Sequence, residues 1–217
     1  MYNYKSVFET EKWCARKLNF MPNLFPGKLI CFEGIDGSGK TTLLKAVQEE
    51  LEKRGIVCYA TKSPTDIMRE TYYWKSFSES KSDERENIDP FGISILALGD
   101  RIIHQGNKII PELQKGNYVL TDRYYLNQIL YQACNEFVSF SKYILKPNLG
   151  VIVDAEPELS TKRIAEREEF ERKDDQRAKW ELRERYLELG RLNDYIVVSS
   201  SKMSVKEEVD VIMEEIL

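Results

Sequence analysis

The chain has 217 residues and a formal net charge of −4, with a sequence pI near 5.4. This length suits one α/β domain with an appendage, and the acidic balance argues against a surface that coats nucleic acid. The single histidine, His104, leaves almost no material for a histidine-based metal centre or catalytic triad. No apolar run approaches the ~18 residues needed to span a bilayer, so no membrane partner is expected.

The composition of the first residues bears on both the location and the packing of the protein. They contain no apolar segment typical of a secretory signal. The four cysteines are scattered without C-x-x-C spacing, so we expect them to be reduced core residues of a cytoplasmic protein. Residues 1–27 are too aromatic for a solvated tail. We expect this N-terminal extension to pack on its own domain or across a dimer; a partner-binding arm is the alternative. Its aromatic residues are Tyr2, Tyr4, Phe8, Trp13, Phe20 and Phe25.

A complete G-x-x-x-x-G-K-T loop follows the first predicted strand, residues 28–32, and precedes an amphipathic helix that starts at Lys40 and ends at Gly55. Such a loop turns backbone N–H groups toward phosphates at a helix N-terminus. Lys40 is expected to reach the β- and γ-phosphates, and the Thr41 hydroxyl to bind Mg²⁺. The residues predicted to bind the nucleoside triphosphate are Gly34, Ile35, Asp36, Gly37, Ser38, Gly39, Lys40, Thr41 and Thr42.

Strands and helices are predicted to alternate along the rest of the chain. Further strands are expected at 56–60, 118–120, 151–154 and 195–198, and residues 77–90 are expected to form an exposed loop. Helical patterns cover 90–116 and 126–137. A further helix is predicted to begin at Pro157, another to end at Gly190, and a last one to follow a Ser204-x-x-Glu207 capping box. We therefore predict a five-stranded, mainly parallel sheet with helices on both faces and ligands at the carboxyl ends of its strands.

An acid and a base stand together at the end of the predicted strand 118–120. Asp122 could hold Mg²⁺ directly or through water, and Arg123 could fork onto a phosphate. Taken alone, such a pair is more often a structural ion pair.

The surrounding residues resemble the thymidylate kinase family. Residues 122–132 are similar to that family's D-R-Y-x-x-S-x-x-A-Y-Q motif, with Asn127 for Ser and Leu130 for Ala. Residues 32–37 look like its F-E-G-x-D-G segment, 100–104 like its D-R-x-x-H helix, and 151–167 like its strand and E-P-E-x-x-x-x-R-I helix. The resemblance covers residue 28 to the end and implies a P-loop NTPase fold with a short helical lid around 167–177.

The resemblance also implies the activity and the roles of single residues. It implies an ATP- and Mg²⁺-dependent enzyme, above all one that converts dTMP to dTDP, acting as a homodimer. Catalysis would rest on Lys40, Asp36, Arg123 and an arginine of the lid. The lid would have to supply it because the phosphate loop contains no arginine; Arg172 is the first candidate and Arg167 the second. The metal would lie at Thr41 and Asp122. The acceptor nucleotide would contact Asp36, Lys62, Arg69, Arg101, Arg123, Gln128 and Tyr131.

Two departures from the family's sequence pattern leave the identity of the acceptor nucleotide undecided. Its T-R-E-P segment is Thr61-Lys62-Ser63-Pro64 here, so Lys62 and Arg69 are the candidates to replace a missing arginine. Ala97 stands where the family places the aromatic ring that stacks on thymine, so base specificity could extend to dUMP or a purine nucleotide. A deoxynucleoside kinase and a non-catalytic nucleotide-binding module also remain compatible with the sequence.

Overall fold

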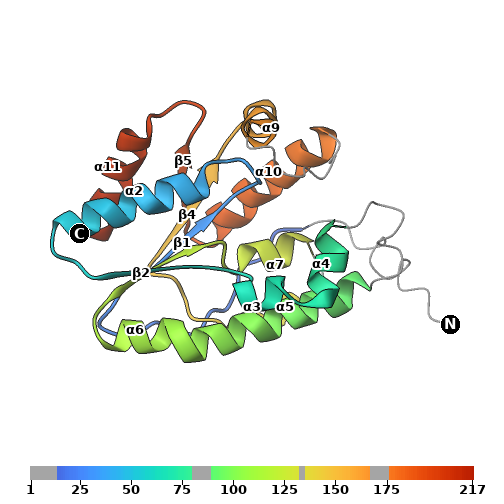
Figure 1. The fold of residues 1–217 in the computed structure, drawn as a ribbon, viewed down its shortest axis with the longest axis horizontal. Coiled ribbons are helices and arrows are strands. Elements are labelled where there is room, and N and C mark those ends of the chain that lie inside the picture. The colour runs from blue at the N-terminus through green and yellow to red at the C-terminus, as the bar shows by residue number, and fades with distance from the viewer. Residues whose placement is uncertain (1–13, 80–88, 132–134, 167–175) are drawn as a thin grey trace.

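The computed structural model describes residues 14–79, 89–131, 135–166 and 176–217, which form an α/β sandwich around one parallel sheet (Figure 1). The sheet has the order β2-β3-β1-β4-β5, and each neighbouring pair is parallel. The β1 strand, which precedes the phosphate loop, is therefore central. The strands are β1 (Leu29–Glu33), β2 (Cys58–Lys62), β3 (Tyr118–Asp122), β4 (Leu149–Asp154) and β5 (Ile196–Ser199).

Helices cover both faces of this sheet (Figure 1). The α2 helix (Lys40–Lys53) and α11 (Val205–Ile216) pack on one face, where their leucines, valines and isoleucines meet those of the strands. On the other face lie α5 (Pro90–His104), α6 (Ile110–Gln114), α7 (Leu126–Tyr131) and α10 (Gln176–Leu192). The remaining short elements are α3 (Asp66–Arg69), α4 (Tyr72–Glu79), η2 (Gln105–Ile109), α8 (Asn135–Phe140), η3 (Ser141–Tyr143) and α9 (Pro157–Ala165).

The predicted architecture is confirmed: the five strands fall within about two residues of their expected positions, and helices alternate with them. The sheet is wholly parallel among the described residues. The Ser204 capping box is also present, because the Ser204 hydroxyl accepts from the Glu207 amide and the Glu207 carboxylate accepts from the Ser204 amide. The part of the predicted lid that spans 167–175 lies outside the described residues, and Gln176 and Arg177 open α10.

The loop expected over 77–90 is wrong at its start, whereas the helix predicted from Pro90 is confirmed. Phe77 belongs to α4, which runs to Glu79, and Pro90 begins α5. A hydroxyl cap explains the difference at the start, since Thr71 accepts a hydrogen bond from the amide of Trp74 and so satisfies an N–H at the start of the helix. At the other end, the Asp89 carboxylate accepts from the amides of Phe91 and Gly92. Residues 80–88 lie outside the described part of the chain.

The helical stretch expected over 90–116 contains a wider turn in its middle. Residues Gln105–Ile109 form a π-helix between α5 and α6. Pro111 follows within two residues and cannot donate a backbone hydrogen bond, so the i→i−4 pattern is interrupted there. Gln105, at the start of this turn, is buried and links it to the segment before β4. Its side-chain amide donates to the carbonyl of Tyr143, and its oxygen accepts from the amide of Leu145.

The described part of the N-terminal extension, residues 14–27, lies against the domain. Leu18 is buried, and its amide donates to the buried Asn193 side chain at 2.7 Å. Farther along, Met21 exchanges backbone hydrogen bonds with the segment before β4, and the amide of Gly27 donates to the carbonyl of Leu113. Cys14, however, is exposed, so the expectation that the cysteines are core residues is wrong at that position. No helix in the described residues has the length and apolarity to cross a membrane.

Candidate active site

The phosphate loop needs its glycines for conformation and for space. Gly34, Gly37 and Gly39 have φ angles of 145°, 76° and 100°, a region that other residues rarely adopt. A Cβ atom at Gly34 would lie 2.5 Å from the carbonyl oxygen of Val153, and one at Gly37 would lie 2.4 Å from that of Ser160. The loop is thus pressed against β4 and α9, which fixes where its N–H groups point.

Lys40 is held inside this loop. Its side chain is only 6% exposed, and its ammonium donates to the carbonyl of Ile35 at 2.7 Å. Burial, with a smaller contribution from the nearby Arg123 cation, lowers the pKa of Lys40 to about 8. A phosphate oxygen beside the ammonium would reverse that shift, so the loop favours an anion at this point.

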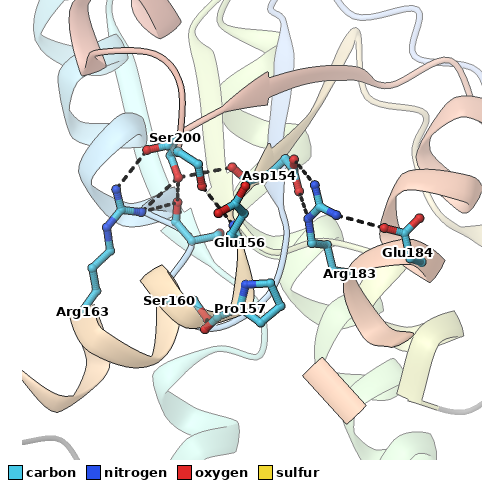
Figure 2. Close-up of polar contacts among 10 residues, drawn as sticks. Asp154, Glu156, Pro157, Ser160, Arg163, Arg183, Glu184 and Ser200 are labelled. Carbon is cyan, nitrogen blue, oxygen red and sulfur yellow. Dashed lines mark hydrogen bonds and ion pairs between the residues drawn. The ribbon is translucent and has the colours of Figure 1, made fainter. Parts of the chain in front are cut away.

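Ser200 and Arg163 support the loop, and Figure 2 shows how these two side chains meet. The Ser200 hydroxyl, just after β5, donates to the carbonyl of Ser38 at 2.8 Å. The Arg163 guanidinium donates to the hydroxyl and carbonyl of Ser200 at 3.0 and 3.1 Å. In the same view, Arg183 of α10 forms a two-point ion pair with Asp154 at the end of β4, at 2.6 and 2.7 Å. Arg163 therefore braces the loop backbone through Ser200, and Arg183 braces the end of β4.

The two residues predicted to hold a metal are in direct contact. The Thr41 hydroxyl donates to the Asp122 carboxylate at 2.5 Å, where the first turn of α2 meets the end of β3. Hydroxyl and carboxylate oxygens are the donors that Mg²⁺ prefers, and Mg²⁺ usually takes one or two protein ligands, with waters and phosphates as the others. In the described residues no group of three His, Cys, Asp or Glu side chains is placed to hold a metal, which agrees with such a sparse site.

Arg123 projects from the residue after β3 toward the phosphate loop. Its backbone adopts a left-handed conformation, with φ of 64°. One guanidinium nitrogen donates to the Gly34 carbonyl, Asn127 and the Tyr186 hydroxyl, at 3.0–3.1 Å. The other forms an ion pair with the exposed carboxylate of Asp36 in the loop. The predicted acceptor-phosphate residue is thus joined to the predicted ATP loop.

Two further cations were expected near Arg123, and the structure places them differently. Arg69 donates to the carbonyl of Pro64 at 2.9 Å, and burial together with the nearby Arg123 charge lowers its pKa. It therefore belongs to the same cationic cluster. The Lys62 ammonium instead forms an ion pair with Asp66 at 2.6 Å, on exposed side chains.

The residues expected at the acceptor base are brought together in the interior. Arg101 is 2% exposed and donates to the Gln128 side chain at 2.8 Å; Gln128 in turn donates to the carbonyl of Ser94 at 3.2 Å. The Arg101 guanidinium also lies over the Tyr125 ring, 5.7 Å from its centroid. Burial lowers the pKa of Arg101, and its Nε has no hydrogen-bond partner within the described residues. A polar group of a ligand would complete this site.

Residues 32–212 match the family model described as thymidylate kinase, which is well over half of the chain. The chain belongs to the thymidylate kinase family. A protein named thymidylate kinase from Carboxydothermus hydrogenoformans is 32% identical over 187 residues, which make up 81% of this chain and 90% of that protein. A protein named probable thymidylate kinase from Archaeoglobus fulgidus is 32% identical over 199 residues, 87% of this chain and 96% of that protein.

For a member of the thymidylate kinase family, the surroundings of Ala97 are the main departure. Ala97 is buried, one helical turn before Arg101. Among the aromatic residues that precede Ala97 in the chain, Tyr72 and Tyr73 pair with each other on α4, with ring centroids 5.5 Å apart, and Phe91 packs on Phe137. The aromatic ring that meets Arg101 is instead that of Tyr125. The position of Tyr125 on the T-D-R-Y-Y segment was visible in the sequence, but its contact with α5 was not.

Sequence reasoning also missed Glu33, the last residue of β1. It is fully buried, and one carboxylate oxygen accepts from the amides of Tyr124 and Leu126 at 3.0 and 2.9 Å. Glu33 thus satisfies N–H groups at the start of α7, while burial raises its pKa. An acid inside an apolar strand was the signal that could have found it. Tyr131 lies in α7, whereas Arg167 and Arg172 fall outside the described residues.

Proposed function

We propose that this thymidylate kinase family member transfers the γ-phosphoryl group of ATP to the 5′-phosphate of dTMP. The observation that carries the proposal is the direct contact of Arg123 with Gly34 and Asp36, which supports a role for this cation in binding the acceptor phosphate beside the ATP loop. Phosphoryl transfer needs little covalent work from a protein. It needs two anionic substrates held in line and the charge of the moving group neutralised.

The proposed roles follow the positions of the side chains. Lys40 and the amides of 34–42 would hold the ATP phosphates, and Arg123 with Arg69 would hold the acceptor phosphate. Asp36 would orient Arg123 and lie near the acceptor sugar. Arg101 and Gln128 would read the base, and Tyr131 would lie near the ribose. A lid arginine, Arg172 or Arg167, would face the transferred group.

Mg²⁺ is the implied metal, and the residues present fit it. Thr41 and Asp122 would hold it, and when bound it would neutralise charge on the ATP phosphates. The Asp122 carboxylate accepts a hydrogen bond from the Thr41 hydroxyl, so the two candidate metal ligands lie side by side. Lys62 would have a lesser role than the resemblance implies, since Asp66 already neutralises its charge.

Because Ala97 replaces the stacking aromatic residue, the preference for thymine is the part of the proposal that most needs a direct measurement. We expect kcat/KM to be highest for dTMP in a panel with dUMP, dGMP and UMP, and thymidine to be unreactive. Adding a ring in Ala97→Phe should lower the KM for dTMP by up to about tenfold, since stacking on a base is worth roughly 1–3 kcal/mol. A purine nucleotide that outperforms dTMP tenfold would replace the substrate within the monophosphate kinase class. Phosphorylation of thymidine would favour a deoxynucleoside kinase, and ATP binding without turnover a non-catalytic module.

We further propose that the chain is a homodimer through the outer face of α5. Exposed apolar residues recur there with glycines seven residues apart, and among the described residues nothing beyond the glycines' own chain neighbours and helix backbone lies within 4 Å of a Cβ built at Gly99 or Gly106. Ile103→Glu, at a side chain that is 63% exposed, should give a monomer in sedimentation, while Lys108→Glu on the neighbouring exposed surface should not. A monomeric wild type would remove the proposal. The exposed residues of this face are Gly92, Ile95, Leu96, Ile102, Ile103 and Gly106.

A further inference from the structure

The N-terminal extension is fixed on both sides of Phe20. The amide of Asn19 donates to the hydroxyl of Ser141, a fully buried residue, at 2.9 Å. The amide of Met21 donates to the carbonyl of Ile144 at 2.8 Å, and its carbonyl accepts from Lys146 at 2.7 Å. Backbone bonds before and after Phe20 leave its ring little freedom to move away from the domain.

The Phe20 ring meets the aromatic residue that lies beneath Arg101. Phe20 contacts Tyr125 in an edge-to-face arrangement, with centroids 5.9 Å apart and planes at 74°. Tyr125 is fully buried, and its hydroxyl donates to the carbonyl of Phe137 at 2.5 Å. On the same ring lies the Arg101 guanidinium, 5.7 Å from the centroid. One aromatic ring therefore links the extension to the base-reading arginine.

We propose that Phe20 is a positioning residue for the acceptor base, acting through Tyr125 on Arg101. The proposal rests on the proposed function, in which Arg101 reads the base. It gives the extension, which precedes the part of the chain that matches the family model, a role in acceptor selection.

The surroundings of Arg101 make its position sensitive to this contact. Arg101 is 2% exposed, so bulk water does not solvate its guanidinium. Its position depends on the hydrogen bond to Gln128 and on the face of Tyr125, and a cation over an aromatic ring is attracted most at the ring centre. When the Phe20 edge is lost, Tyr125 can tilt about its hydroxyl bond. A displacement of about 1 Å of a positioning group costs up to ~100-fold in an enzyme, and we expect a smaller value here because Gln128 remains.

The test compares three substitutions of Phe20 with one matched control in the full-length chain. Phe20→Ala and Phe20→Leu should raise the KM for dTMP about five- to tenfold, with the KM for ATP unchanged within twofold. Phe20→Tyr keeps the ring edge and should restore the wild-type value. Phe25→Ala removes the same ring type from the same segment and from the same apolar cluster, and should destabilise the fold without changing the KM for dTMP.

A base-free acceptor separates base positioning from a general change of the site. The inhibition constant of 2-deoxyribose 5-phosphate, which lacks the base that Arg101 would contact, should be the same in wild type and Phe20→Leu. The inference is overturned if that constant rises as much as the KM for dTMP, if the KM for ATP rises equally, or if Phe25→Ala has the same effect. Absence of dTMP turnover in the wild type would instead overturn the proposed function, and a dTMP-active wild type with an unaltered Phe20→Leu would overturn this inference alone.

Discussion

Lys40→Ala is expected to lower kcat for phosphoryl transfer by at least about 100-fold, a loss of roughly 2.7 kcal/mol or more of transition-state stabilisation. Within the loop, Lys40 is the one side chain with a full positive charge, and its ammonium already lies among loop carbonyls where phosphate oxygens would bind. The measurement is steady-state turnover of ATP and dTMP at saturating concentrations. Retention of more than a tenth of the wild-type kcat would contradict the assignment.

Two controls separate the charge of Lys40 from its packing. Lys40→Met keeps most of the apolar stem and should lose as much activity as the alanine variant. Both variants should fold as stably as the wild type, because burying the Lys40 charge opposes folding, as its lowered pKa indicates. Lys45→Ala, on the exposed side of the same helix, should leave turnover unchanged.

Arg123→Ala should raise the KM for dTMP by about 10- to 100-fold and lower kcat, with the KM for ATP nearly unchanged. The partner of Arg123 is proposed to be the acceptor phosphate, and a guanidinium–phosphate fork is a strong, charge-assisted contact. The substitution leaves Tyr186 and Asn127 paired, since the Tyr186 hydroxyl donates to Asn127 at 3.0 Å without it. Alanine also keeps a Cβ at this left-handed position, so the backbone preference changes little.

Thymidine provides the matching control for Arg123. It carries the base and sugar of dTMP without the phosphate, so its inhibition constant should be the same in wild type and Arg123→Ala. An equal loss of ATP and dTMP binding would show that Arg123 supports the loop through Gly34 instead of holding the acceptor. Arg191→Ala, at an exposed position on α10, reports the effect of removing a surface arginine.

Local patterns predicted most of the fold because they are short-range. The glycines of 34–39, the apolar strand before them and the helix after them depend on neighbouring residues, and their order implies a parallel sheet. Lys40, Thr41, Asp122 and Arg123 were predicted in the same way, since each lies at or after the carboxyl end of a predicted strand, where ligands of parallel sheets are expected to bind. The π-helix and the cap at Thr71 were missed, because both depend on hydrogen bonds that apolar periodicity does not report.

Contacts between distant residues explain what the sequence could not supply. Arg163 and Ser200 are 37 residues apart and meet only because β4 and β5 are neighbours. Lys62 was predicted at the acceptor, and in the structure its ammonium forms an ion pair with Asp66, which begins the helix after the strand of Lys62. The contact of Phe20 with Tyr125 spans about a hundred positions, and no local pattern of either residue indicates it.

Glu33 has a consequence for how the protein opens. Its carboxylate belongs to the central strand, yet it binds the amides at the start of α7, so the segment that carries the ATP loop and the segment that carries the acceptor side chains share one buried group. Separating them would strand an acid in the interior without its donors, which is costly. We therefore expect the two segments to belong to one cooperative unit of unfolding, so that a local fluctuation that opens one also opens the other. A state with an ordered phosphate loop and a disordered acceptor segment is then expected to be rare.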